Sequence, residues 1–222
     1  MQKSSTVPRR PRGRPQVRPD EETLRVIVDA ARDEFLSRSF GDVSMASVAG
    51  RAGVSTKTMY RLVPTKADLF RQVVSARIGQ FILELDIETL DAVEPVEALT
   101  RILTVWSDLM LSADATAMYR VALTERDRFP EIATFFFENA IGPAGQILEA
   151  WLRRQSARGI LTLADPVLAS GMLRGMMAME PQRAALLGQC PLPDAAEIAA
   201  RARSSAELFV NGCRAGSRSQ ER

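Results

Sequence analysis

The chain has 222 residues, enough for one large domain or two small ones, and 46% of them are hydrophobic, so a buried core is possible. It contains no histidine and only two cysteines, Cys190 and Cys213, which excludes Ser-His-Asp or Cys-His catalysis and argues against a disulfide framework or zinc finger. Residues 1–19 carry six basic residues and no acidic ones, whereas residues 20–222 carry a net charge of −4.

The first 19 residues form a basic arm that we expect to be disordered, because it is rich in arginine and proline. Its charge favours a polyanionic partner, nucleic acid or an anionic membrane surface, and its composition is equally compatible with an inert solvated tail. No apolar segment follows it, and no stretch of the chain approaches the roughly 18 uncharged apolar residues of a membrane span. We therefore expect a cytoplasmic protein.

The spacing of apolar residues predicts four helices between residues 20 and 85. The first stops before Gly41, the second ends at Gly53, and the third, TKTMYRL, is closed by Pro64. The fourth is long, and Asp68 completes a capping box at its start. The expected N-cap residues are Asp20, Ser44, Ser55 and Thr65.

Longer helices are predicted after residue 94, and no segment has the pattern of a strand. Gly142-Pro143 is expected to kink or break one of them, and a loop is expected over residues 181–193. The expected helices are 95–112, 113–127, 130–159, 165–179 and 194–210. With about nine helices in all, the predicted fold class is all-α, a three-helix N-terminal domain followed by a helical bundle.

The most specific pattern is SMASVAGRAGVSTKTMYRLVPTKADLF, residues 44–70. Two short helices meet at Gly53, where glycine can adopt the positive φ of a sharp turn, and the small side chain of Ala49 lets them approach closely. The second helix has one apolar side and one polar, basic side, as a helix in the DNA major groove requires. This pattern predicts a helix-turn-helix.

Residues 29–70 resemble the TetR family of bacterial transcriptional regulators. Residues 119–140 are similar to the start of the ligand domain in the AefR-like branch of that family. At Val63 the family usually has an aromatic residue, so we expect looser packing there. The matching residues of the first segment are Ala31, Phe35, Gly41, Ser44, Val48, Ala49, Ala52, Gly53, Val54, Ser55, Tyr60, Thr65, Lys66 and Leu69.

The resemblance implies a role in DNA binding for residues of the helix-turn-helix. Side chains of the third helix would face base edges or nearby phosphates, and others would hold phosphates. Two alternatives remain open: Tyr60 as a half-buried core residue and Lys66 as a solvated lysine beside a helix cap. The expected DNA-binding residues are Arg12, Arg14, Ser44, Ser55, Thr56, Lys57, Thr58, Tyr60, Arg61 and Lys66.

The basic arm contains Arg12-Gly13-Arg14-Pro15, which matches the core of an AT-hook. Glycine lets the backbone lie along the minor-groove floor, proline keeps the chain extended, and the two guanidinium groups favour the negative potential of a narrow A·T tract. We therefore expect minor-groove reading by this arm, with an inert tail as the alternative.

The resemblance also implies an effector cavity among the long helices between residues 65 and 159, although each candidate residue can instead be plain core. Trp106 and Met110 lie four residues apart on one helix face, and methionine adapts to varied ligand shapes. Few charges lie among the candidates, which favours a hydrophobic or aromatic effector. The expected lining residues are Phe81, Leu85, Trp106, Met110, Phe136, Phe137 and Ile141.

The last two helices would pair with their copies in a four-helix dimer interface. Two glycines four residues apart permit close helix approach, either across such an interface or within one chain. The expected interface residues are Gly171, Met172, Gly175, Met176 and Met179.

These patterns predict a homodimeric regulator, a repressor that binds a palindromic operator and is released by a small molecule. The alternative is a DNA-binding protein with a collapsed pocket, switched by a protein partner or constitutive. The chain has no GxxxxGK[ST], GxGxxG or GxSxG motif, so we expect no enzyme, metal or cofactor site. The expected segments are the basic arm 1–19, the helix-turn-helix domain 20–66, the ligand-binding and dimerisation domain 67–213, and a polar tail 214–222.

Overall fold

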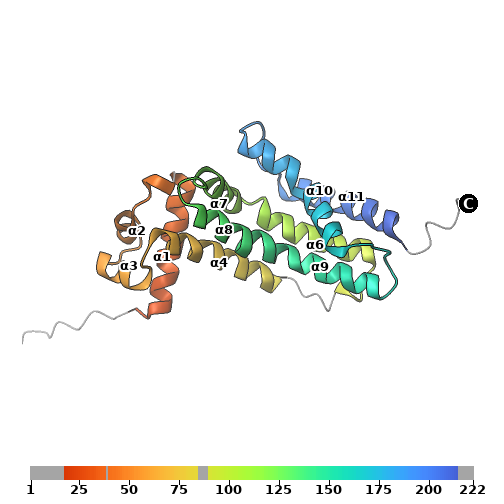
Figure 1. Cartoon of the computed structure of the whole chain (residues 1–222), viewed down its shortest axis with the longest axis horizontal. Helices are drawn as coiled ribbons and strands as arrows, with labels where there is room; N and C mark the ends of the chain where they lie inside the picture. The colour runs from red at the N-terminus through yellow and green to blue at the C-terminus, as the bar shows by residue number, and fades with distance from the viewer. Residues whose placement is uncertain (1–17, 39, 85–89, 215–222) are drawn as a thin grey trace, which may run out of the picture.

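The computed structural model describes residues 18–38, 40–84 and 90–214, and for residues 79–84 it describes the backbone alone. Within these ranges the chain is helical, and the sole β contact is an isolated bridge between Leu161 and Arg214. The predicted all-α class is therefore confirmed. Figure 1 shows the helices nearest the N-terminus gathered at one end of the molecule and the last two helices lying together at the other.

The first helix, α1 (Asp20–Ser37), begins without the expected side-chain cap. Pro19 occupies the N-cap position, and Asp20 lies in the first turn. The prediction that Asp20 caps α1 is wrong, because its carboxylate is turned away to Arg61, 41 residues along the chain. Acidic residues in the first turn still favour this end of the helix, where backbone N–H groups carry partial positive charge.

The helix-turn-helix consists of α2 (Met45–Arg51) and α3 (Thr56–Leu62). Both predicted serine caps are confirmed: the Ser44 hydroxyl accepts a hydrogen bond from the Ser47 N–H at 3.0 Å, and the Ser55 hydroxyl accepts one from the Thr58 N–H at 3.1 Å. Gly53 lies between the helices with φ +66°, the left-handed conformation predicted for the turn.

Two substitutions of glycine by alanine, one in this turn and one in the helix before it, should have opposite effects on stability. Gly53→Ala is expected to lower the free energy of unfolding by about 1–2 kcal/mol, because an L side chain strains a left-handed backbone. Gly50→Ala, inside α2 with open space around its Cβ position, should instead raise it by up to about 1 kcal/mol. Urea unfolding of the two variants measures both values, and equal effects would contradict this account.

The helices α1, α2 and α3 form the N-terminal head of the molecule, and the fourth helix, α4 (Lys66–Glu84), leads from this head into the rest of the chain. At its start, the Thr65 hydroxyl accepts a hydrogen bond from the Asp68 N–H at 3.0 Å, which confirms Thr65 as its cap. Val63, just before it, is only 1% exposed, so the smaller side chain is fully enclosed. Three aromatic rings pack against one another and fix α1 against α4. They belong to Phe35 of α1, Phe40 of the short 3₁₀ turn Phe40–Asp42, and Phe70 of α4.

The remaining bundle contains α6 (Pro95–Met110), α7 (Ala113–Thr124), α8 (Pro130–Phe136) and α9 (Gly142–Ala157). Of the two outcomes expected at Gly142-Pro143, a kink or a break, the break does not occur, because a π-helical stretch, Phe137–Ile141, joins α8 to α9. A wider turn at this point accommodates the proline, which lacks an N–H and crowds the carbonyl four residues earlier.

The last two helices, α10 (Pro166–Leu186) and α11 (Ala195–Cys213), are both longer than predicted. The expected loop over residues 181–193 is wrong in its first part, because α10 continues through Pro181 to Leu186. The residues after Pro181 are Gln, Arg, Ala, Ala and Leu, all strong helix formers. In the core, α10 packs on α9, and α11 packs on α6.

Candidate functional sites

One face of α3 is open to solvent and carries polar and basic side chains. Thr56, Lys57, Tyr60 and Arg61 are all exposed, whereas Met59 on the opposite face is fully buried. Tyr60 is 54% exposed, so about half of its side chain is open to solvent. The arrangement leaves this face of α3 open to a ligand outside the molecule.

The guanidinium group of Arg61 lies against the start of α1. Its Nη1 and Nη2 atoms donate to the two carboxylate oxygens of Asp20, each at 2.7 Å. Both side chains are more than half exposed. The hydrogen bond between them lowers the pKa of Asp20 and raises that of Arg61, so both groups stay charged over a wide pH range.

Four of the other polar residues predicted to contact DNA, Ser44, Ser55, Thr58 and Lys66, have partners within the chain. The hydroxyl groups of Ser55 and Thr58 lie 2.9 Å apart, and Ser44 caps α2. The Lys66 amine donates to the Gly41 carbonyl at 3.2 Å and lies 4.4 Å above the centre of the Phe40 ring. Partial burial lowers the pKa of Lys66. Arg12 and Arg14 lie outside the described residues.

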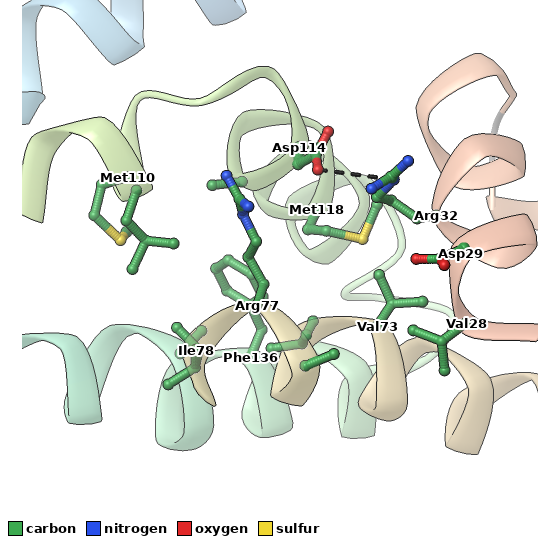
Figure 2. Close-up of a pocket in the computed structure, with 15 residues that line it drawn as sticks. Val28, Asp29, Arg32, Val73, Arg77, Ile78, Met110, Asp114, Met118 and Phe136 are labelled. Atoms are coloured by element: carbon green, nitrogen blue, oxygen red, sulfur yellow. Dashed lines mark ion pairs between the residues drawn. The ribbon is translucent and has the colours of Figure 1, made fainter. Parts of the chain in front are cut away.

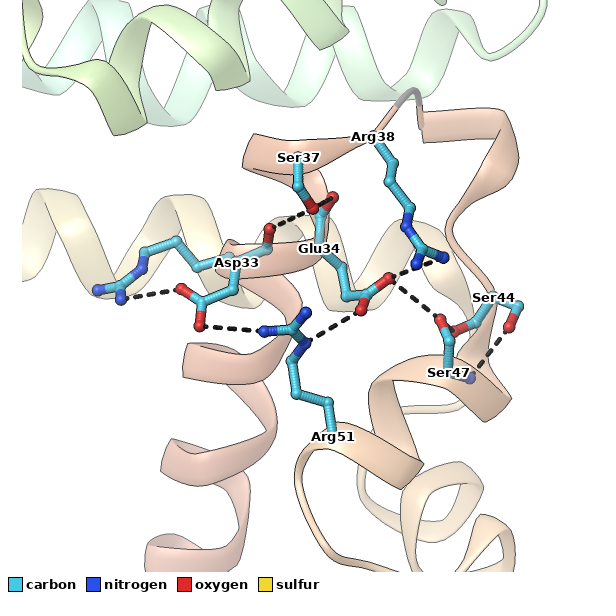
Figure 3. Close-up of polar contacts among 8 residues, drawn as sticks. Asp33, Glu34, Ser37, Arg38, Ser44, Ser47 and Arg51 are labelled. Carbon is cyan, nitrogen blue, oxygen red and sulfur yellow. Dashed lines mark hydrogen bonds and ion pairs between the residues drawn. The ribbon is translucent and has the colours of Figure 1, made fainter.

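A buried carboxylate joins α1 to α2 (Figure 3). The Glu34 side chain is 4% exposed, and it accepts from Arg51 Nε at 3.0 Å and from the Ser47 hydroxyl at 3.3 Å. Arg38 lies 3.5 Å away from the same carboxylate. Arg51 also pairs with Asp33 at 3.7 Å, so it bridges two acids of α1. Because Ser47 belongs to the first turn of α2, this network fixes the helix on which α3 packs.

A pocket lies where α1 meets α4, α6, α7 and the α8–α9 segment (Figure 2). Its cavity volume is about 90 Å³. The apolar side chains that line it include Val28, Val73, Ile78, Met110, Met118 and Phe136. The pocket is thus shared between the helix-turn-helix head, through α1, and the bundle.

Four charged side chains also line this pocket: Asp29 and Arg32 from α1, Arg77 from α4, and Asp114 from α7. Arg32 reaches across the pocket to Asp114, with Nε 3.9 Å from the carboxylate (Figure 2). It also donates to the Asp33 carboxylate at 3.1 Å. The hydrogen bond that Arg32 donates to Asp33 is the main cause of a raised pKa at Arg32. Charged and apolar side chains together make the pocket amphipathic.

Sequence reasoning missed all four charged residues. It looked for the cavity only after residue 64, which leaves out Asp29 and Arg32, and it considered apolar residues alone, which leaves out Arg77 and Asp114. A signal was present: Val28 and Arg32 are one helical turn apart on α1, so a charge lies on a face that is otherwise apolar.

The predicted lining residues are divided in the structure. Met110 and Phe136 line the pocket. Trp106 is buried in the core at 5% exposure and is not a lining residue, and Phe137 is 65% exposed on the surface. Ile141 is half-buried beside the core. The side chain of Phe81 and the whole of Leu85 lie outside the described residues.

One face of α10 exposes apolar side chains. Met172 is 59% exposed, Met176 38% and Met179 63%. Gly171 and Gly175 have open space where a Cβ would be, so neither makes a close contact with another part of the described chain. These five residues form a methionine-rich strip that a single chain leaves uncovered.

Two family models match the chain. The model for bacterial regulatory proteins of the tetR family matches residues 27–73, which contain most of α1, all of α2 and α3, and the start of α4. The model for the AefR-like transcriptional repressor C-terminal domain matches residues 97–212. The chain belongs to the TetR family. Regulators of this family bind DNA and are not enzymes.

Solved structures of TetR-family regulators share the fold. A transcriptional regulator from Mesorhizobium loti has a TM-score of 0.77 at 22% identity, with 89% of this chain and 100% of that chain covered. The flavonoid-responsive regulator FrrA has a TM-score of 0.71 at 24% identity, with 89% and 100% covered. FadR from Bacillus subtilis, solved in complex with stearoyl-CoA, has a TM-score of 0.65 at 20% identity, with 85% and 98% covered. No curated protein matches the chain in sequence.

Within the described part of this TetR-family chain, no helix has the length and apolar character of a membrane span. Nor do three or more His, Cys, Asp or Glu side chains of that part come together where they could hold a metal ion.

Proposed function

We propose that this TetR-family protein is a dimeric repressor that reads a palindromic operator through α3 and is released when a small molecule occupies the pocket at α1. The observation that carries the proposal is the position of that pocket, which is lined by α1 of the head together with α4 and α7. Residues 20–66 act as the reading head, and residues 67–213 as the effector and dimer domain. A ligand between them can change the position of the reading head directly.

The test of this proposal is a selection of binding sites from random duplex DNA with the full chain, followed by footprinting. Because each chain offers one short reading helix, a dimer should protect two half-sites about 34–36 Å apart, or a multiple of that spacing. A single half-site occupied by a monomer, or the absence of any preferred sequence, would refute the proposal.

The effector is proposed to be amphipathic, with an apolar body and a polar end. The apolar body fits the valine, methionine and phenylalanine wall, and the polar end fits the group of Asp29, Arg32 and Asp114. This revises the expectation of a purely hydrophobic ligand, since four charged residues line the pocket. The flavonoid of FrrA and the stearoyl-CoA of FadR both combine apolar and polar parts, and both classes are starting points for a screen.

The pocket must open to receive such a ligand. Its cavity of about 90 Å³ is well below the roughly 300–1,000 Å³ of pockets that hold drug-sized molecules. Opening has to separate α1 from α4 or α7, and α1 is tied to α2 by the network around Glu34. Movement of α1 therefore reorients the helix-turn-helix.

Arg32 is expected to be needed for the effector response. It contacts Asp114 in the pocket and Asp33, which in turn pairs with Arg51 of α2. In the wild type a bound effector should change operator affinity by about 5- to 150-fold, and Arg32→Gln should bring that factor close to 1. Arg71→Gln, a control on α4 outside the pocket, should leave the effect of the effector on operator affinity unchanged. Fluorescence anisotropy with and without effector measures the factor, and an unchanged response in Arg32→Gln would exclude this route.

The small cavity also favours a second candidate, a TetR-family regulator with no small-molecule effector that is switched by a protein partner or is constitutive. A thermal-shift screen with flavonoids and acyl-CoA esters separates the two. Stabilisation together with weakened operator binding supports an effector, whereas neither effect in any compound supports the second candidate.

The basic arm is proposed to add minor-groove contacts beside each half-site through Arg12 and Arg14. The described chain begins next to α3, because Pro19 directly precedes Asp20, the partner of Arg61. The last residues of the arm, Arg18 and Pro19, thus lie close to the proposed DNA interface.

A further inference from the structure

The pair of Asp20 and Arg61 differs from the neighbouring ion pairs of α1. Glu22 pairs with Arg18 and Glu21 with Arg25, each one helical turn away. Asp20 instead reaches from the first turn of α1 to the last turn of α3. Both of its oxygens are used, each 2.7 Å from a guanidinium nitrogen, and such a bidentate contact fixes the plane of the guanidinium group.

Stability alone gives no reason for this geometry. Both side chains are exposed, 54% for Arg61 and 60% for Asp20, and exposed ion pairs contribute little to folding. The pair does have a consequence for recognition, because Arg61 lies on the open face of α3. A free arginine on that face would choose among many rotamers and among nearby phosphates.

The guanidinium group keeps donors for a second partner. Arginine has five N–H groups, and an end-on contact through Nη1 and Nη2 leaves the edge that contains Nε. That edge has the spacing to donate to O6 and N7 of guanine, the commonest specific contact in the major groove. The carboxylate of Asp20 at the same time repels a phosphate that would compete for Arg61.

We propose that Asp20 is a specificity-determining residue, which holds Arg61 for bidentate recognition of a guanine and keeps it from binding phosphate. The inference rests on the proposed reading of DNA by α3 and goes beyond it by assigning a second residue, on another helix, to the choice of base. Asp20 acts through Arg61 and is therefore a positioning residue.

The test uses the full chain and the operator obtained by selection, with each base pair of a half-site changed in turn. Arg61→Ala should remove the preference at one guanine, a loss of about 5- to 150-fold in discrimination. Asp20→Asn should reduce the preference at that same base pair by at least about 5-fold, while random DNA is bound equally or more tightly. The double variant should lose no more than Arg61→Ala alone, because the two residues act as one unit.

Glu21→Gln is the matched control, since it removes the same charge one residue away without touching Arg61. It should leave the base preference unchanged. If Asp20→Asn tightens operator and random DNA by the same factor and keeps the preference, Asp20 merely competes with DNA and the inference is wrong. A wild-type chain that selects no sequence would overturn the proposed function and this inference with it, whereas a wild-type preference that survives Asp20→Asn overturns the inference alone.

Discussion

Glu34→Ala is expected to lower the free energy of unfolding by about 2–3 kcal/mol, a large effect for the loss of one polar side chain. The Glu34 carboxylate is 4% exposed and accepts from Arg51 and Ser47, with Arg38 close by. Its removal leaves these side chains without their acceptor. The effect stays below that of a fully buried pair, because Arg51 and Arg38 are about half exposed and water replaces part of the contact.

Thermal unfolding measures this loss as a midpoint lower by roughly 4–12 °C for a chain of this size. Asp33→Ala is the control: this neighbouring carboxylate also pairs with Arg51 but is 44% exposed, so it should cost less than about 1 kcal/mol. A double variant of Glu34 and Arg51 should cost less than the sum of the two single ones. If Glu34→Ala melts like the wild type, the network does not hold α2 in place.

Met172→Glu combined with Met176→Glu is expected to abolish operator binding without touching the head. In the proposed dimer both side chains face the partner, and a carboxylate buried there without a cation is strongly unfavourable. A monomer reads one half-site only, so affinity should fall to the level of non-specific binding, roughly 1,000-fold or more.

Sedimentation and fluorescence anisotropy on the same samples test this prediction. Leu123→Glu provides the control, since Leu123 is 52% exposed on α7 and lies outside the methionine-rich strip. It should remain dimeric and bind normally. A double methionine variant that stays dimeric would place the interface elsewhere, and one that is monomeric yet binds with full affinity would contradict the two-half-site model.

The elements that depend on neighbouring residues could be predicted from the sequence. Ser44, Ser55 and Gly53 act within four residues of their own positions, so a cap or a turn is visible in the local pattern. The helix-turn-helix and the all-α class followed from such local signals.

The features that sequence reasoning missed depend on distant parts of the chain or on local compensation. Aspartate is a residue type that favours the N-cap position, yet the Asp20 carboxylate pairs with Arg61 on another helix. Pro143 and Pro181 are helix breakers by residue type, but a π-helical stretch and a run of strong helix formers compensate for them. The pocket joins helices far apart in sequence, so neither its charged residues nor the position of Trp106 could be read from one segment.

The shared pocket also limits how this protein can be recombined. A chimera that keeps residues 67–213 and takes its first helices from another regulator would lose Val28, Asp29 and Arg32, which form one wall of the pocket. Such a hybrid would acquire a new operator preference and at the same time a different ligand preference. In the proposed function, sensors built from this chain need these three residues grafted onto the incoming first helix, because ligand binding and DNA recognition share α1.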